Sequence, residues 1–184
     1  MALEIKRKGY GQVEPNHLSA QHTGQIYAQL PAMTAGEGDA AATPIAQLEN
    51  GQFLKYNYAD GRAALDGDGE WMLVYCEEKL YDERRQGHKD FVLLASDMAD
   101  GTIYPRLLKT NVGDIFTTNT FGGAGTGYDT EVANAITLTV GDKLYVGADG
   151  FLAASGDNNG PVFQVVKEYQ LPDAQPAVKL QRIQ

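Results

Sequence analysis

The sequence predicts an all-β fold: a single β-barrel or β-sandwich domain with extended N- and C-terminal arms and few or no helices. Gly-Asp and Asp-Gly turns divide the chain into short stretches of alternating apolar residues, and 21 glycines and 7 prolines disfavour long helices. Residues 138–169 show the pattern best, because an Asp-Gly turn joins two short strands and a third strand follows. We expect an arm at 1–23, a β-rich body at 24–169, and a second arm or edge strand at 170–184.

A similar pattern occurs earlier in the chain. Two units of a hairpin plus a third strand would indicate an internal duplication within one β-rich body. The alternative is that both units only share the Asp-Gly turns common in β proteins. The matching stretches are 51–54 with 141–144, 59–61 with 148–150, 63–65 with 152–154, 66–69 with 156–160, and 71–75 with 162–166, with a partial third copy at 112–116.

Composition limits the classes of partner. A chain of 184 residues with 43% hydrophobic content suits one domain with a real core. Its formal charge of −9 argues against binding to nucleic acid or to an anionic membrane surface. We find no apolar run long enough for a transmembrane helix and no secretory signal. The single Cys76 excludes an internal disulfide and fits a reducing cytoplasm.

The first 23 residues differ in charge from the rest of the chain. Leu3 and Ile5 alternate with charged residues, and a basic run at 6–8 follows. Three basic residues against two acidic ones give this stretch +1, which leaves −10 for the remainder. A basic arm on an acidic body can reach an acidic neighbour. The alternative is a frayed, solvated terminus.

The expected strands follow one another with turn residues between them. The stretch 71–76 is the most apolar and should be central, whereas Pro105 places its strand near an edge or a bulge. The charged stretch 77–90 fits either a helix with i,i+4 ion pairs or a long excursion between strands. The expected strands are 23–30, 44–48, 53–58, 71–76, 91–95, 102–109, 115–121, 132–140, 143–147, 151–154 and 162–166.

The residues offer little convergent chemistry. The three histidines lack metal-ligand spacing, and Cys76 in an apolar strand is expected to be a buried structural thiol. The glycine loop 121–127 lacks the ending of a phosphate-binding loop, so we interpret it as a flexible loop or a close backbone contact. Asp66, Asp68 and Glu70 have the spacing of a calcium-loop start without its downstream residues. A turn is the better interpretation, although weak cation binding stays open. We therefore predict no catalytic residue, no cofactor and no metal ligand.

Residues 141–169, GDKLYVGADGFLAASGDNNGPVFQVVKEY, resemble the closing half of head-decoration (cement) proteins of tailed bacteriophages. In that family a GD-x-L-x-V-x-x-DG-x-L hairpin precedes a last strand, and residues 70–94 also resemble phage head-associated sequence. The resemblance implies a non-enzymatic virion structural protein, made in the host cytoplasm. It implies binding of the major capsid protein on the outside of the capsid, as a homo-oligomer such as a trimer that stabilises the expanded head. The stretch 77–90 is a departure from the small cement proteins.

Two groups of residues are the expected partner interface. Arg and Tyr are enriched at interface hot spots, which favours the second group, although local ion pairs would also explain it. The first group is Leu3, Ile5, Lys6, Arg7 and Lys8, and the second is Tyr81, Arg84 and Arg85.

Other functions stay open. The chain could be a minor capsid, head-fibre or tail-tube protein. It could also be a β-sandwich carbohydrate-binding module, in which case surface tyrosines would contact the sugar. An enzyme would need a cleft with two carboxylates of perturbed pKa, as in a glycan hydrolase. The candidate tyrosines are Tyr56, Tyr58, Tyr81, Tyr104 and Tyr128.

Overall fold

The structure, a computed structural model, describes residues 2–14, 26–34, 42–57, 59–76, 92–99, 104–126 and 130–184. These residues form fourteen strands and one short helix, which confirms the all-β prediction. The strands are β1 (Leu3–Ile5), β2 (Ile26–Gln29), β3 (Gln47–Glu49), β4 (Phe53–Asn57), β5 (Arg62–Ala64), β6 (Trp71–Val74), β7 (Val92–Leu94), β8 (Arg106–Leu108), β9 (Ile115–Thr118), β10 (Ile136–Leu138), β11 (Lys143–Val146), β12 (Leu152–Ala153), β13 (Val162–Gln170) and β14 (Pro176–Arg182), and the helix is α2 (Ala95–Ala99).

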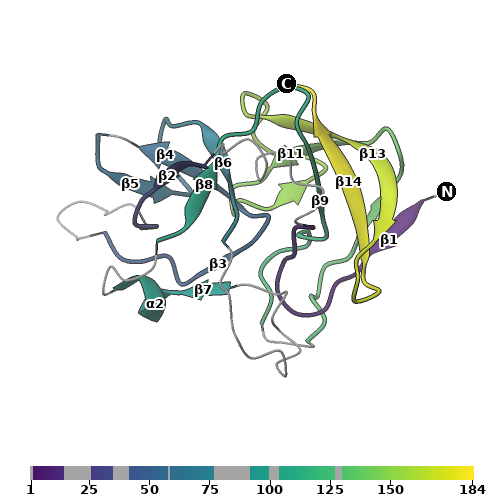
Figure 1. Ribbon diagram of the computed structural model, residues 1–184, viewed down its shortest axis with the longest axis horizontal. Coiled ribbons are helices and arrows are strands. Elements are labelled where there is room, and N and C mark those ends of the chain that lie inside the picture. The colour runs from purple at the N-terminus through teal and green to yellow at the C-terminus, as the bar shows by residue number, and fades with distance from the viewer. Residues whose placement is uncertain are drawn as a thin grey trace.

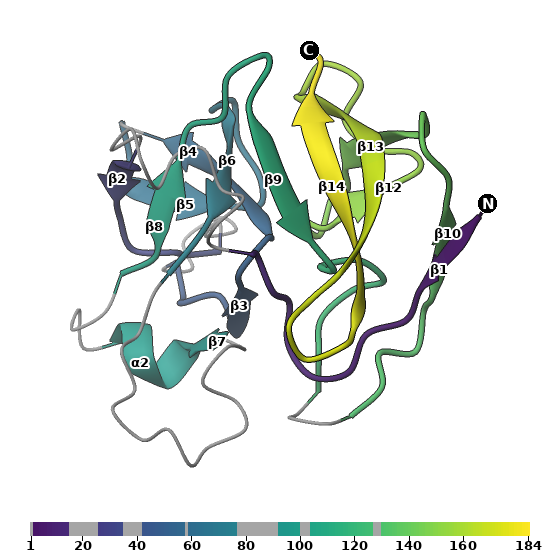
Figure 2. The same cartoon turned by 45° about the vertical axis from the view of Figure 1, so that its right-hand side comes forward.

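Two five-stranded antiparallel sheets make up the body (Figure 1). The first has the order β2-β8-β6-β4-β5 and the second the order β12-β11-β13-β14-β9. Figure 2 shows the two curled sheets side by side, the first on the left and the second on the right. Two small sheets complete the structure: β3 pairs with β7 below the first sheet, and β1 pairs with β10 at the side of the second. Each large sheet resembles half a barrel. One core lies between the two sheets, and a second core lies between the first sheet and the layer of β3, β7 and α2.

The two large sheets have the same topology. In each, a hairpin (β4–β5 or β11–β12) is followed by a third strand (β6 or β13) and a fourth (β8 or β14), and the remaining edge strand (β2 or β9) precedes the hairpin. The register is also the same, since Tyr56↔Ala63 in the first sheet corresponds to Val146↔Leu152 in the second. We call residues 26–108 the first repeat and 115–182 the second. The internal duplication indicated by the sequence is therefore present in the fold.

Each repeat closes its curled sheet in the same way. The chain that leaves β2 forms a parallel bridge from Ala32 to Ala63 of β5, the opposite edge strand. The chain that leaves β9 forms a parallel bridge from Phe121 to Leu152 of β12. Both edges of each sheet are thus brought together, which leaves fewer unpaired backbone groups for aggregation.

A four-residue turn with the same hydrogen bonds occurs three times, and this supports the duplication. The fourth residue donates its N–H to the carbonyl of the first, at 2.9–3.2 Å, and the first donates its N–H to the side-chain oxygen of the fourth. The third residue is glycine with φ of 90° to 102°, a left-handed conformation that glycine adopts without strain. This glycine and the fourth residue then pair with a neighbouring strand, at Val74, Arg182 or Val165. The turns are residues 49–52, 111–114 and 139–142.

The first sheet is buried on both faces. One face packs on the second sheet, where Phe53 of β4 lies 5.3 Å from Phe163 of β13, measured between ring centroids. The other face packs on the layer of β3, β7 and α2 through Leu54 and Met72. Successive residues of β6 point to opposite cores, so all four are buried. This confirms the prediction that the apolar strand is central.

The second repeat presents a polar outer face where the first presents an apolar one. The shared register places Phe53↔Leu73 of the first repeat at the same position as Lys143↔Gln164 of the second. In the first repeat this face fills the core of the second repeat. In the second repeat it faces outward and carries polar residues, like the outer faces of terminal repeats in solenoid proteins.

The described part of the predicted N-terminal arm and the whole of the predicted C-terminal arm are integral parts of the body. The N-terminal segment, which we define as residues 2–14, pairs β1 with β10 and then runs along the second repeat, with bridges at Lys8↔Glu131 and Val13↔Thr118. The C-terminal strand β14 lies between β13 and β9 and is an interior strand, so the prediction of an arm or edge strand is wrong. The reason is the turn at residues 171–175, which returns β14 along the whole length of β13.

Candidate functional site

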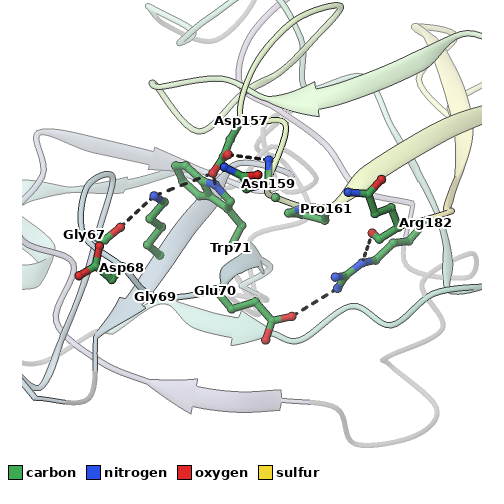
Figure 3. A pocket seen from close by; sticks show the side chains of 12 residues that line it. Gly67, Asp68, Gly69, Glu70, Trp71, Asp157, Asn159, Pro161 and Arg182 are labelled. Carbon is green, nitrogen blue, oxygen red and sulfur yellow. Dashed lines mark hydrogen bonds and ion pairs between the residues drawn. The ribbon is translucent and has the colours of Figure 1, made fainter.

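An open groove of about 650 Å³ lies between the two repeats (Figure 3). Its walls are the loop between β5 and β6, the loop between β12 and β13, and the end of β14. The two loops occupy equivalent places in the repeats, and the sequence match between 66–69 and 156–160 had related them. Two of the groove's walls are therefore equivalent loops from the two repeats.

Trp71 connects the two walls of the groove. Its indole Nε1–H donates to Oδ2 of Asp157 at 2.9 Å. The Nζ of Lys55 lies 5.0 Å from the Trp71 ring centroid and 4.0 Å from Oδ2 of Asp157, and it donates to the Gly67 carbonyl. The hydrogen bond from Trp71, with a smaller contribution from the backbone N–H of Asn159, holds the pKa of Asp157 below its usual value of 3.8.

A second network of charges lies at the other end of the groove. Glu70 forms two ion pairs: Nζ of Lys109 lies 3.0 Å from its Oε2, and Nη1 of Arg182 lies 3.5 Å from its Oε1. Arg182 also donates to the carbonyl and the hydroxyl of Thr110, and to the carbonyl of Gln184. Glu70 thus ties the loop after β5 to the end of β14.

These contacts define the chemistry available in the groove. Asp157 stays ionised and occupied by the indole, whereas a general acid needs a raised pKa. Glu70 is engaged by two cations, so the predicted spacing of Asp66, Asp68 and Glu70 does not leave three unpaired carboxylates. Within the described ranges, no three His, Cys, Asp or Glu side chains come together as a potential metal site. The charged side chains of the groove are therefore engaged mainly with one another.

A buried ion pair lies beneath the N-terminal segment. Arg7 and Glu49 are 1% and 0% exposed, and their Nη2 and Oε2 atoms are 3.0 Å apart. Arg7 also donates to the carbonyls of Gly9, Phe121 and Gly123. Glu49 accepts the backbone N–H groups of Gly11 and Gly125, each at 2.6 Å.

Every charged atom of this pair therefore has a partner, as a buried pair requires. Sequence reasoning singled out Arg7 but missed Glu49, because Glu49 looks like an ordinary turn residue in the sequence. The glycine loop at 121–126 supplies carbonyls and a close backbone contact, which confirms one of the two predictions for it.

The predicted interface residues differ in their exposure to solvent. Ile5 and Arg7 are buried, so they are not available as surface contacts in this arrangement. Leu3 is half-buried beside Leu138, Lys6 forms an exposed ion pair with Glu131, and Lys8 is exposed. Tyr81, Arg84 and Arg85 lie outside the described residues, as do the three histidines.

Other predicted residues are placed as follows. Cys76 is buried, as expected, and desolvation raises the pKa of its thiol to about 11. Of the candidate sugar-binding tyrosines, Tyr56 is buried in the second core and Tyr104 is exposed. Tyr58, Tyr81 and Tyr128 lie outside the described residues.

Exposed apolar residues occur at two of the three repeated turns. The second position of the turn is Val112 in one copy and Val140 in another, and these side chains are 68% and 59% exposed. The third copy has Asn50, which is buried and hydrogen-bonded to Cys76. Turn tips usually carry polar residues, so these two exposed valines are a feature that sequence analysis missed.

Comparisons with known proteins give no relative. No protein-family model matches the chain, and neither the curated proteins nor the solved structures include a match. In the part of the chain that the structure describes, we find no helix with the length and apolar character to cross a membrane.

Proposed function

We propose that this protein is a non-enzymatic structural component of a tailed-phage virion that binds the major capsid protein on the outside of the head and stabilises the expanded shell. The observation that carries the proposal is the form of residues 141–169, the stretch that resembles cement proteins. It folds as one unit of turn, hairpin and long strand, and this unit is repeated in the body.

The properties of the body support an assembly role. A clamp on a pressurised shell must resist deformation, and this body has two cores that share a central sheet. The charged groups of the groove and of the Arg7–Glu49 pair serve internal cohesion. The exposed valines at the turn tips are suited to contact with an apolar patch on a capsid subunit.

Only part of the predicted arm interface lies at the surface. Since Ile5 and Arg7 are buried, the proposed capsid surface consists of the exposed tips Val112 and Val140. Partners, homo-oligomeric state and location on the virion surface all belong to this proposal.

Co-sedimentation with expanded phage heads tests the proposal. We expect saturable binding at a fixed ratio to the major capsid protein. Val112→Asp and Val140→Asp should weaken binding without unfolding the body, because both side chains are exposed. Ala148→Asp, at the exposed tip of the β11–β12 hairpin, is the matched control and should bind normally. No saturable binding of the unmodified chain would overturn the capsid role, and binding to tail polymers or glycans instead would favour the other functions.

A further inference from the structure

The strand β10 takes its partner from a distant part of the chain. In the first repeat, β3 leads into the turn 49–52 and pairs with β7. In sequence, β7 comes after β6 and before β8 of the same repeat. In the second repeat, β10 precedes the equivalent turn 139–142. Only five residues join β13 to β14, so this repeat contains no counterpart of β7.

The N-terminal strand β1 fills the missing place. It pairs with β10 antiparallel, as β7 does with β3, and Leu3↔Leu138 corresponds to Leu93↔Leu48. Beyond β1, backbone hydrogen bonds continue along the second repeat, from Val132 N–H to Arg7, from Gly9 N–H to Thr130 and from Glu14 N–H to Thr117. The segment that completes the second repeat is thus connected in sequence to the first.

The receiving surface is a built site with its own specificity. Glu49 is fully buried and accepts the Arg7 guanidinium, and Gly123 and Phe121 accept further N–H groups of Arg7. Charge adds to this, because the segment is basic in an acidic protein and Lys6 lies 2.8 Å from Glu131. The site therefore recognises a short extended strand with an arginine at a fixed position.

We propose that this surface is a strand-exchange site, and that its partner is the N-terminal segment of a second copy of the chain. The contacts with β10 and β9 are the same whether the segment comes from its own copy or from a neighbour. Exchange of an identical element between protomers is a low-cost route to oligomers, and addition of a strand supplies main-chain hydrogen bonds across the interface. The proposal goes beyond capsid binding and holds with or without it.

Cross-linking of two full-length variants tests the exchange. Glu4 and Thr137 are register partners of β1 and β10, and both side chains are exposed. Glu4→Cys and Thr137→Cys are co-expressed as separate chains, then oxidised and analysed on a non-reducing gel. A disulfide needs directly opposed positions. Cys76 is buried, and burial disfavours its reactive thiolate form.

A covalent dimer linked between positions 4 and 137 of different chains, identified by peptide mass spectrometry, is the expected result. The control pairs Glu4→Cys with Ala148→Cys, an exposed residue outside the β1–β10 pair, and should give no such dimer. A double variant with both cysteines on one chain reports closure within a copy. Cis closure in the double variant, with no dimer above control from the separate variants, would overturn the proposal. No capsid is present, so the outcome is independent of the proposed function.

Discussion

Removal of the Arg7 guanidinium should strongly destabilise the folded protein. Arg7→Met keeps an apolar stem but leaves the carboxylate of Glu49, which is 0% exposed, without its cation. Loss of one partner of a buried pair costs about 3–5 kcal/mol. For a chain of this length 1 kcal/mol corresponds to about 2–4 °C in Tm, so the midpoint should fall by roughly 6–20 °C. Urea and thermal unfolding, followed by circular dichroism, measure both quantities.

Two comparisons separate this effect from a general loss of packing. Glu49→Gln keeps an acceptor for only one of the N–H groups of Gly11 and Gly125, because these bond to different carboxylate oxygens. Its cost should therefore combine an unpaired guanidinium with the loss of one backbone hydrogen bond. The double variant Arg7→Met/Glu49→Gln should then be less destabilised than the sum of the single variants, by about 1–3 kcal/mol. Lys6→Met breaks only an exposed pair and should cost less than about 1 kcal/mol. A cost for Arg7→Met as small as that of Lys6→Met would refute the reasoning.

Three further predictions concern the repeated turn, the groove and the thiol. Gly51→Ala should destabilise more than Gly141→Ala: both glycines have positive φ, but a Cβ at 51 meets buried atoms as close as 2.4 Å and one at 141 meets none within 4 Å, as chemical denaturation will report. The pKa of Asp157 is lower in the folded protein than its usual value of 3.8, so its stabilising contribution is present above pH 3.8 and is lost as the pH falls through the folded-state pKa. The fluorescence emission of Trp71, the single tryptophan, should report this acid step. Asp157→Asn should remove the step. Cys76 should resist alkylation at neutral pH until the protein unfolds, because its pKa is about 11.

Each of these predictions has a contradicting outcome. Equal costs for the two glycine substitutions would mean that strain at positive φ, and not the buried contact, dominates. An acid step in tryptophan emission that survives Asp157→Asn would assign the step to another carboxylate or to global unfolding, and Asp68→Asn is the matched control in the same groove. Alkylation of the native thiol as fast as that of an unfolded chain would show that Cys76 is accessible.

The sequence alone predicted most of the strands and turns of the body, and it indicated a duplication. Asp-Gly and Gly-Asp pairs are local signals, since they fix the backbone of a turn without help from distant residues. The match between 51–54 and 141–144 therefore became a match in register and hydrogen bonding. The apolar stretch at 71–76 indicated burial on both faces for the same local reason.

Only the tertiary structure decided where the two ends of the chain pack and which residues form the sites. Alternation in β1 does not tell which strand will pair with it, and the basic run around Arg7 looks like a solvated terminus until Glu49 is placed beneath it. The groove needs Trp71 of one repeat and Asp157 of the other, which are 86 residues apart. Such contacts depend on how the two repeats pack, and a local sequence pattern contains no information about that packing.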